Sequence, residues 1–205
     1  DIKSVLKVLS SNYLTQGPLV PEFESNLCKY TGSRYCVVVN SATSGLHLAC
    51  LALDIKKGDY IWTSPISFVA SANCASYCKA KVDFVDIDLN TFNICPSKLE
   101  KKLIISKKNK SLPKAIIIVH LAGNPCNLKE IKKLSEKYNF KIIEDASHAL
   151  GSEYNNYKIG SSKFSDVTIF SFHPVKIITT AEGGAILTND KKIFTLVNTL
   201  RSHGI

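Results

Sequence analysis

Short apolar runs alternate with amphipathic segments along almost the whole chain, and this alternation restricts the fold more than any other feature. Seven runs rich in strand-forming residues cover residues 35–40, 59–64, 81–88, 114–123, 141–146, 166–172 and 184–189. Helical patterns separate most of them, at residues 44–53, 67–78, 96–107 and 127–139. Apolar strands that alternate with helices form a mostly parallel sheet covered on both faces. We therefore predict an α/β fold with a seven-stranded sheet flanked by helices. One of the last two strands should run antiparallel to its neighbour, because no helix is predicted between them.

The composition is typical of a globular protein with its own core. At 205 residues, with 45% hydrophobic and 21% charged residues, the chain can bury a core without disulfides or metals. No apolar run approaches the ~18 residues that a membrane span needs. Residues 1–12 predict an amphipathic helix rather than a signal peptide. We expect no membrane association.

The net charge of +9 comes almost entirely from lysines, because Arg34 and Arg201 are the only arginines. A nucleic-acid-binding protein typically clusters arginine with aromatic residues. The densest lysines lie between Lys98 and Lys114, in a segment typical of a solvated helix and loop. We therefore expect no nucleic-acid partner, while the positive charge favours anionic, phosphate-bearing ligands.

The seven cysteines form no CxxC motif, and their odd number does not indicate a disulfide framework. Cys74 and Cys78 lie one helical turn apart, but no second pair of His or Cys residues completes a zinc site, so we expect no metal. Reduced thiols indicate a cytoplasmic protein. The chain has no methionine and no evident end after its last residue, and we expect it to be a piece of a longer protein.

Ligands of open α/β sheets bind outside the carboxyl ends of the strands, so the residues that follow each strand are the candidate site residues. Thr43 and Ser44 follow the first strand, in a turn of small and hydroxyl residues that opens a helix. Backbone N–H groups and the helix dipole at such a turn attract phosphate. An ordinary N-cap explains the same residues and is preferred when the turn is taken alone.

Two further strand ends carry side chains with two possible roles each. Phe68 follows the second strand, and its ring is either a wall for a stacked aromatic ligand or, as is commoner, part of the core. Asp145 ends the fifth strand, and His148 follows three residues later. A carboxylate at the dry end of a strand needs a cationic partner or several donors. A protonated pyridine nitrogen is one such partner, capping of the next turn is the alternative, and both interpretations stay open.

Lys176 follows the sixth strand and lies five residues after Ser171. Its neighbours in the chain are Phe, Pro, Val and Ile, and desolvation among them disfavours the charged form of an amine. A neutral amine attacks a carbonyl and forms an imine. Without other signals, a lysine whose stem packs while its head reaches water is the preferred interpretation.

The four strand ends together supply a phosphate turn, a stacking ring, a partner for a pyridine nitrogen and an imine-forming lysine. These groups are the ones that pyridoxal 5′-phosphate requires. Their order along the chain agrees with this cofactor, because the phosphate turn comes first, the aspartate second and the lysine last. The sequence therefore predicts a pyridoxal-phosphate site.

The motifs VNSATSGLHLACLAL, SPISFVASANCASYC, VDFVDID, IIEDASHALGS and FSFHPVKIITTAEGGAILTN follow one another along residues 39–189. In sequence and order they resemble the DegT/DnrJ/EryC1/StrS family of nucleotide-sugar aminotransferases, and the resemblance runs from Leu14 to the last residue. It implies the large domain of a fold type I pyridoxal-phosphate transferase at residues 25–205. A helix and a segment that borders the substrate would precede it, at residues 1–24.

The resemblance also implies roles for individual residues. Lys176 would hold the cofactor covalently and shuttle protons, Asp145 would keep the pyridine nitrogen protonated, and Phe68 would stack on the ring. The other implied residues are phosphate ligands at Thr43, Ser44 and Ser171, a neighbour of the ring hydroxyl at His148, and a substrate border at Leu14, Thr15, Gln16 and Gly17.

Within the family, the chain is most similar to enzymes that aminate C4 of a UDP-linked 4-keto-6-deoxy-N-acetylhexosamine on the pathway to pseudaminic acid. Glutamate is the expected amino donor, and a homodimer with a shared active site is the expected assembly. Another nucleotide keto-sugar, of the perosamine or 3-amino type, and a non-catalytic regulatory homologue that binds pyridoxal phosphate remain alternatives. Some relatives are dehydratases with histidine in place of the lysine, and Lys176 argues against that reaction.

Family members are much longer than this chain. We therefore expect three of their parts to lie outside it. These are an N-terminal segment with a substrate-contacting tyrosine, the small C-terminal domain, and the loop that a neighbouring subunit extends to the cofactor phosphate.

Overall fold

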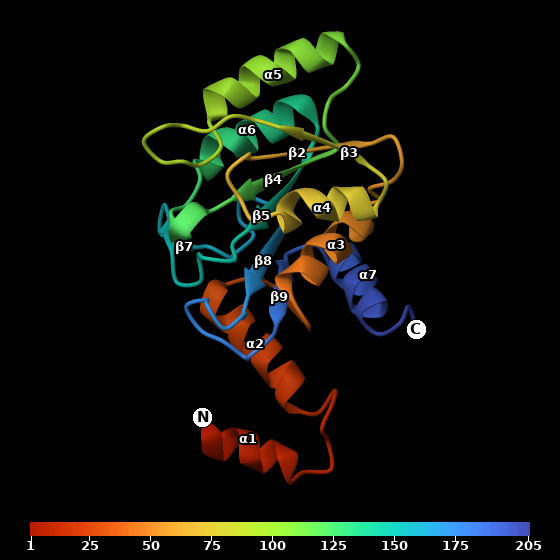
Figure 1. Cartoon of the computed structure of the whole chain (residues 1–205), viewed down its shortest axis with the longest axis vertical. Helices are drawn as coiled ribbons and strands as arrows, with labels where there is room; N and C mark the ends of the chain where they lie inside the picture. Colours follow the sequence, from red (N-terminus) through yellow and green to blue (C-terminus); the bar gives the residue numbers. More distant parts are fainter.

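The computed structural model describes residues 1–205, and one seven-stranded sheet forms its centre (Figure 1). The strand order is β1-β9-β8-β5-β4-β2-β3. The strands are β1 (Tyr35–Val39), β2 (Tyr60–Thr63), β3 (Lys81–Phe84), β4 (Ala115–Val119), β5 (Lys141–Asp145), β8 (Val167–Ser171) and β9 (Gly184–Thr188). Neighbouring strands pair in parallel except at β9, which is antiparallel to both β1 and β8. The predicted seven strands and the antiparallel strand are therefore confirmed.

Helices cover both faces of this sheet (Figure 1). One face carries α3 (Ala42–Ala52), α4 (Ala70–Tyr77) and α7 (Lys191–Arg201), and the other carries α2 (Leu19–Thr31), α5 (Pro96–Lys108) and α6 (Leu128–Tyr138). Local sequence sets where several of them begin. Ser41, Asn127 and Asp190 accept N–H groups of the first turns of α3, α6 and α7, and a proline starts α5.

The alternation of side chains along the central strands builds a separate core on each face. Ile116 and Ile118 of β4 join the core under α5 and α6, whereas Ala115 and Ile117 join the core under α3 and α4. All four residues are fully buried. This double burial explains why β4 is apolar throughout instead of alternating apolar with polar residues.

Several elements differ from the prediction. Strand β4 ends at Val119, and the residues after it form the short 3-10 helix η1 (Leu121–Gly123) instead of continuing the strand. A small hairpin of β6 (Glu153–Tyr154) and β7 (Tyr157–Lys158) was not predicted, because two-residue strands leave no periodic pattern. Helix α2 was not predicted either. It continues without a break through residues 24 and 25, where the predicted N-terminal segment meets the predicted large domain.

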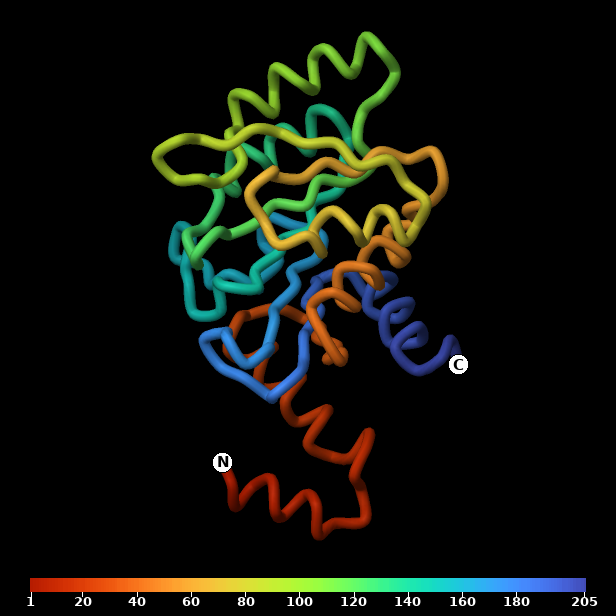
Figure 2. The backbone as a smooth tube through the Cα atoms, viewed as in Figure 1, coloured from red at the N-terminus to blue at the C-terminus, as the bar shows by residue number.

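The predicted N-terminal helix forms as α1 (Ile2–Leu9), and it buries none of its residues. Figure 2 shows this segment extending away from the body of the molecule before the chain turns into α2. Its apolar side chains Ile2, Val5, Leu6 and Leu9 are all exposed. None of the helices combines the length and the hydropathy that crossing a bilayer requires.

Gly184 allows the first strand-to-helix turn to lie against the start of β9. A Cβ atom at this position would meet the Ala42 nitrogen and the Ser41 carbonyl carbon at 2.6 Å, which no side chain tolerates. At Gly183 the added atom would meet only the Oγ1 of Thr180 at close range, and a side-chain hydroxyl can rotate away. The close approach of the backbone at Gly184 therefore fixes the position of the N-terminus of α3.

We predict that Gly184→Ala lowers the free energy of unfolding by about 1–3 kcal/mol, the usual cost of an overpacked site. Gly183→Ala is the matched control and should cost less than half as much, since only the Thr180 side chain has to move. Chemical denaturation of the two variants and the unsubstituted chain measures both values. Equal losses in the two variants would contradict the role assigned to the Ser41–Ala42 backbone.

Candidate active site

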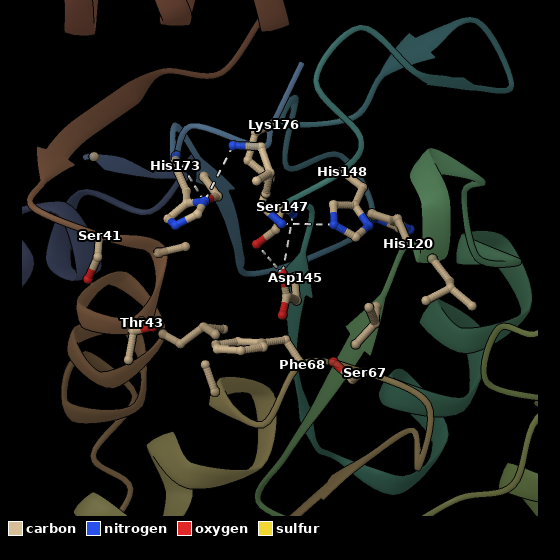
Figure 3. Close-up of a pocket in the computed structure, with 18 of the residues that line it drawn as sticks. Ser41, Thr43, Ser67, Phe68, His120, Asp145, Ser147, His148, His173 and Lys176 are labelled. Carbon is tan, nitrogen blue, oxygen red and sulfur yellow. Dashed lines mark hydrogen bonds between the residues drawn. The ribbon is translucent and has the colours of Figure 1, made fainter. Parts of the chain in front are cut away.

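A cavity of about 320 Å³ opens at the carboxyl edge of the sheet, within the range of ~300–1,000 Å³ usual for small-molecule sites. It lies where the ends of β1, β8, β5 and β4 meet the start of β9, so it occupies the position at which open α/β sheets bind ligands. The residues that line it include Ser41, Thr43, Ser67, Phe68, His120, Asp145, Ser147, His148, Ser171, His173, Lys176, Glu182 and Gly183 (Figure 3).

The carboxylate of Asp145 is the most enclosed charged group that lines the cavity, with 5% of the residue exposed. It ends β5 on the face covered by α3 and α4, two residues after Ile143 of the same core. Ser71 donates its hydroxyl to Oδ2 at 2.6 Å, and Ser147 donates its hydroxyl to Oδ1 at 2.7 Å and its N–H to the same oxygen at 3.2 Å. Three donors therefore satisfy this carboxylate without neutralising its charge.

Lys176 extends its side chain into the same cavity (Figure 3). Its Nζ lies 2.8 Å from Nε2 of His148. Partial burial lowers the pKa of His148 below the usual value of 6.5, and the positive charge of Lys176 lowers it further, while Asp145 acts in the opposite direction. His148 is therefore neutral at pH 7, and its unprotonated ring nitrogen accepts a hydrogen from the amine.

The surroundings of Lys176 differ from the predicted apolar pocket. Val175 is 76% exposed and Ile177 is 62% exposed, so the apolar neighbours in the chain lie on the surface and do not enclose the amine. The lysine itself is half-buried. Its environment is set by His148 and the cavity wall, which belong to distant parts of the chain, and not by the residues beside it in the sequence.

The hydroxyl-bearing turn after β1 lines the opposite side of the cavity. Ser41 and Thr43 contribute to the lining, at the N-terminus of α3. Ser44 does not line the cavity, because its N–H and its hydroxyl both bond the Oγ of Ser41, each at 3.1 Å. The predicted N-cap is therefore present, with Ser41 as the capping residue, and it coexists with the lining role of Thr43. Ser171, at the end of β8, also lines the cavity.

Phe68 is 72% exposed and lines the cavity, so the alternative that it belongs to the core is wrong. It lies in the connection between β2 and α4, next to Ser67 (Figure 3). A large aromatic ring left open to a cavity is available to stack on a flat ligand. The structure does not bring Leu14, Thr15, Gln16 and Gly17 to this cavity, because they lie in the connection between α1 and α2.

Several polar residues of the site were not predicted. His120 follows β4, and its Nε2 bonds the Oε2 of Glu144 at 2.7 Å in a fully enclosed pair. The N–H of Cys126 donates to Nδ1, so the ring proton of His120 lies on Nε2 and points to Glu144. Its position at a strand end was a usable signal, whereas its partner on another strand was not visible from the sequence.

His173 and Glu182 also line the cavity, at the two ends of the loop that carries Lys176, and Nε2 of His173 lies 3.9 Å from Oε1 of Glu182. No local pattern in the sequence distinguishes them from other exposed polar residues. The structure contains no group of three or more His, Cys, Asp or Glu residues that could hold a metal ion.

The residues at the cavity match the chemical groups of pyridoxal phosphate. An enclosed carboxylate suits a protonated ring nitrogen, and an amine in the same cavity suits an aldehyde. A helix N-terminus with Ser41 and Thr43 suits a phosphate. Phe68 offers an uncovered ring face.

The family model described as the DegT/DnrJ/EryC1/StrS aminotransferase family matches residues 1–205 of the chain. A protein of Campylobacter jejuni named UDP-4-amino-4,6-dideoxy-N-acetyl-beta-L-altrosamine transaminase is 49% identical over 205 residues, which are 100% of this chain and 53% of that protein. The chain therefore spans about half the length of the curated relatives it matches.

Solved structures agree with this relationship. The Helicobacter pylori aminotransferase PseC, involved in the biosynthesis of pseudaminic acid, superimposes with a TM-score of 0.90 at 41% identity, over 99% of this chain and 53% of that one. A Streptococcus pneumoniae protein assigned to the sugar aminotransferases, solved in its PLP form, gives a TM-score of 0.84 at 29% identity over 97% of this chain and 54% of that one. The sequence match over all 205 residues and the shared fold show that the chain belongs to the DegT/DnrJ/EryC1/StrS aminotransferase family.

Proposed function

We propose that this chain forms the cofactor-binding part of a pyridoxal-phosphate-dependent nucleotide-sugar aminotransferase. The observation that carries the proposal is that the amine of Lys176 and the enclosed carboxylate of Asp145 line one cavity, opposite the hydroxyl-bearing N-terminus of α3. When bound, the cofactor supplies an aldehyde for the amino group and a ring that accepts electrons. The chain supplies the groups that hold and orient it.

Asp145 holds a positive charge at the ring nitrogen. Its carboxylate is enclosed, and an unpaired charge in such a place is costly, so a cationic partner in the cavity is favoured. Ser41 and Thr43 bind the phosphate at the positive end of the α3 dipole, and Ser171 adds a third hydroxyl. Ser44 supports the turn as the bonding partner of Ser41.

Lys176 is the residue that attaches the cofactor and moves protons. The neutral His148 accepts a hydrogen from Nζ at 2.8 Å and so holds the amine inside the cavity, next to the expected position of the ring hydroxyl. Phe68 covers one face of the ring.

The relatives indicate the substrate. The names of the Campylobacter and Helicobacter proteins concern an amino-dideoxy sugar on UDP and pseudaminic acid biosynthesis. From these names we propose that the enzyme aminates C4 of a UDP-linked 4-keto-6-deoxy-N-acetylhexosamine, with glutamate as the amino donor. The proposal includes a homodimer and a large domain at residues 25–205, with Leu14 to Gly17 bordering the substrate. It also includes a cytoplasmic location, which the seven free cysteines support.

The lysine assignment predicts a visible absorbance band when pyridoxal phosphate is added to the protein expressed from its complete reading frame. Lys176→Ala should abolish this band, because no other amine lines the cavity. Lys129→Ala is the control, since Lys129 lies on the exposed side of α6 and the band should persist. A band that survives in Lys176→Ala would show that another amine binds the cofactor.

The reaction is tested by incubating the same protein with glutamate and UDP-linked 4-keto-6-deoxy-N-acetylhexosamine. We expect an amino sugar with nitrogen at C4, identified by mass spectrometry and NMR, and at least ~100-fold less product from Lys176→Ala. Amination at another carbon, or of another keto-sugar only, would replace the proposed substrate. Cofactor binding without turnover of any keto-sugar would favour a regulatory protein.

The neutral state of His148 predicts how stability changes with pH. Its pKa is lowered in the folded state, so the unfolded chain binds the proton more readily below pH 6.5 and stability falls as the pH decreases. Unfolding measured by denaturant at pH 7 and pH 5 should show a smaller loss in His148→Gln than in the unsubstituted protein. His203→Gln, at an exposed histidine near the chain end, should show the unchanged loss. Identical losses in all three proteins would argue against the neutral imidazole.

A further inference from the structure

We infer that Ser71 is a positioning residue for the cofactor, acting through Asp145. This inference rests on the proposed function, because it concerns how the carboxylate is presented to a ring nitrogen. Ser71 lies in the first turn of α4 and is fully buried. It does not line the cavity, so any effect on a bound ligand has to pass through another residue.

The geometry links Ser71 to both Asp145 and the cavity wall. Its Oγ lies 2.6 Å from Oδ2 of Asp145 and 2.6 Å from Oγ of Ser67, which lines the cavity. A carboxylate only accepts hydrogen bonds, so the single hydroxyl proton of Ser71 points to Asp145. Ser67 must therefore donate to Ser71. The charge of Asp145 fixes the direction of both bonds, and the oxygen of Ser67 presents only lone pairs to the cavity.

The two oxygens of Asp145 are held from different elements. Ser71 of α4 holds Oδ2, and Ser147, in the turn after β5, holds Oδ1 through its hydroxyl and its N–H. Contacts on both oxygens prevent rotation of the carboxylate about its terminal torsion, which is otherwise broad for aspartate. Without Ser71, Oδ2 loses its donor and the carboxylate plane is fixed from one side only.

This arrangement orients the remaining lone pairs of Asp145 into the cavity. A charge-assisted hydrogen bond from a ring N–H depends on that orientation, because it weakens steeply as its angle departs from linearity. The phosphate turn and the lysine lie elsewhere in the cavity and do not contact Ser71. Loss of the Ser71 hydroxyl should therefore weaken the contact with the ring nitrogen and leave the other cofactor contacts intact.

The test compares two ligands, pyridoxal 5′-phosphate and 1-deazapyridoxal 5′-phosphate, in which CH replaces the ring nitrogen. Dissociation constants are measured by titration of absorbance and fluorescence, using the protein expressed from its complete reading frame. We expect Ser71→Ala to weaken the binding of pyridoxal phosphate by about tenfold, as for loss of one aligned contact to a charged group. The binding of the deaza ligand should change by less than about twofold, because it makes no such contact.

Two further variants make the result decisive. Ser135→Ala removes a buried serine hydroxyl whose hydrogen bond, to the carbonyl of Phe140, is also 2.6 Å long but lies outside the cavity, and it should leave both constants unchanged. Asp145→Asn should abolish the preference for pyridoxal phosphate over the deaza ligand. If the preference survives in Asp145→Asn, the ring nitrogen does not face Asp145 and the proposed function loses that assignment.

The inference about Ser71 fails separately. If Ser71→Ala weakens the binding of both ligands equally, the residue is merely structural. If it weakens neither, the carboxylate is positioned without it. Either result overturns the inference while leaving the assignment of Asp145 intact.

Discussion

Two consecutive carboxylates, Glu144 and Asp145, lie at the end of β5 and are almost fully enclosed, so both need hydrogen-bond donors. The site depends on which residues supply these donors. Because side chains alternate along a strand, Glu144 lies on the face of the sheet covered by α6, and Asp145 lies on the face covered by α4. Glu144 is bonded by His120, Thr168 and Ser165, which ties together the ends of β4 and β5 and the start of β8. Asp145 lines the cavity, with its oxygens held by Ser71 and Ser147. One carboxylate thus stabilises the edge of the sheet, while the other, in the function proposed above, serves the ligand.

Much of the fold follows from local sequence. The runs at residues 115–119 and 142–143 are apolar because both faces of these strands are buried, and burial on both faces is a strong signal. The hairpin β6–β7 and helix α2 were not predicted, for two different reasons. The hairpin is too short for any period, and α2 buries only Leu27 and Thr31, so its apolar stripe is weak.

The candidate site was predictable where a residue type at a strand end has few alternative roles. Asp145, Lys176, Phe68 and Thr43 all reach the cavity, whereas Ser44 bonds its own cap instead. The network around Asp145 was not predictable, because Ser71 meets it across a sequence separation of 74 residues. The surroundings of Lys176 were mispredicted for the same reason: the chain neighbours point to the surface, and contact comes from His148, 28 residues away.

The antiparallel strand β9 gives the lysine-bearing loop an unusual constraint. Ser171 pairs with Gly184 across β8 and β9, so both ends of the loop are anchored at adjacent points of the sheet. Closing the segment in this way removes part of its chain entropy before any ligand arrives. This anchoring limits the space that the amine of Lys176 can reach, and in the function proposed above it would raise the effective concentration of the amine toward a bound aldehyde. The reversal of a single strand thus reduces the freedom of the segment that presents the amine to the cavity.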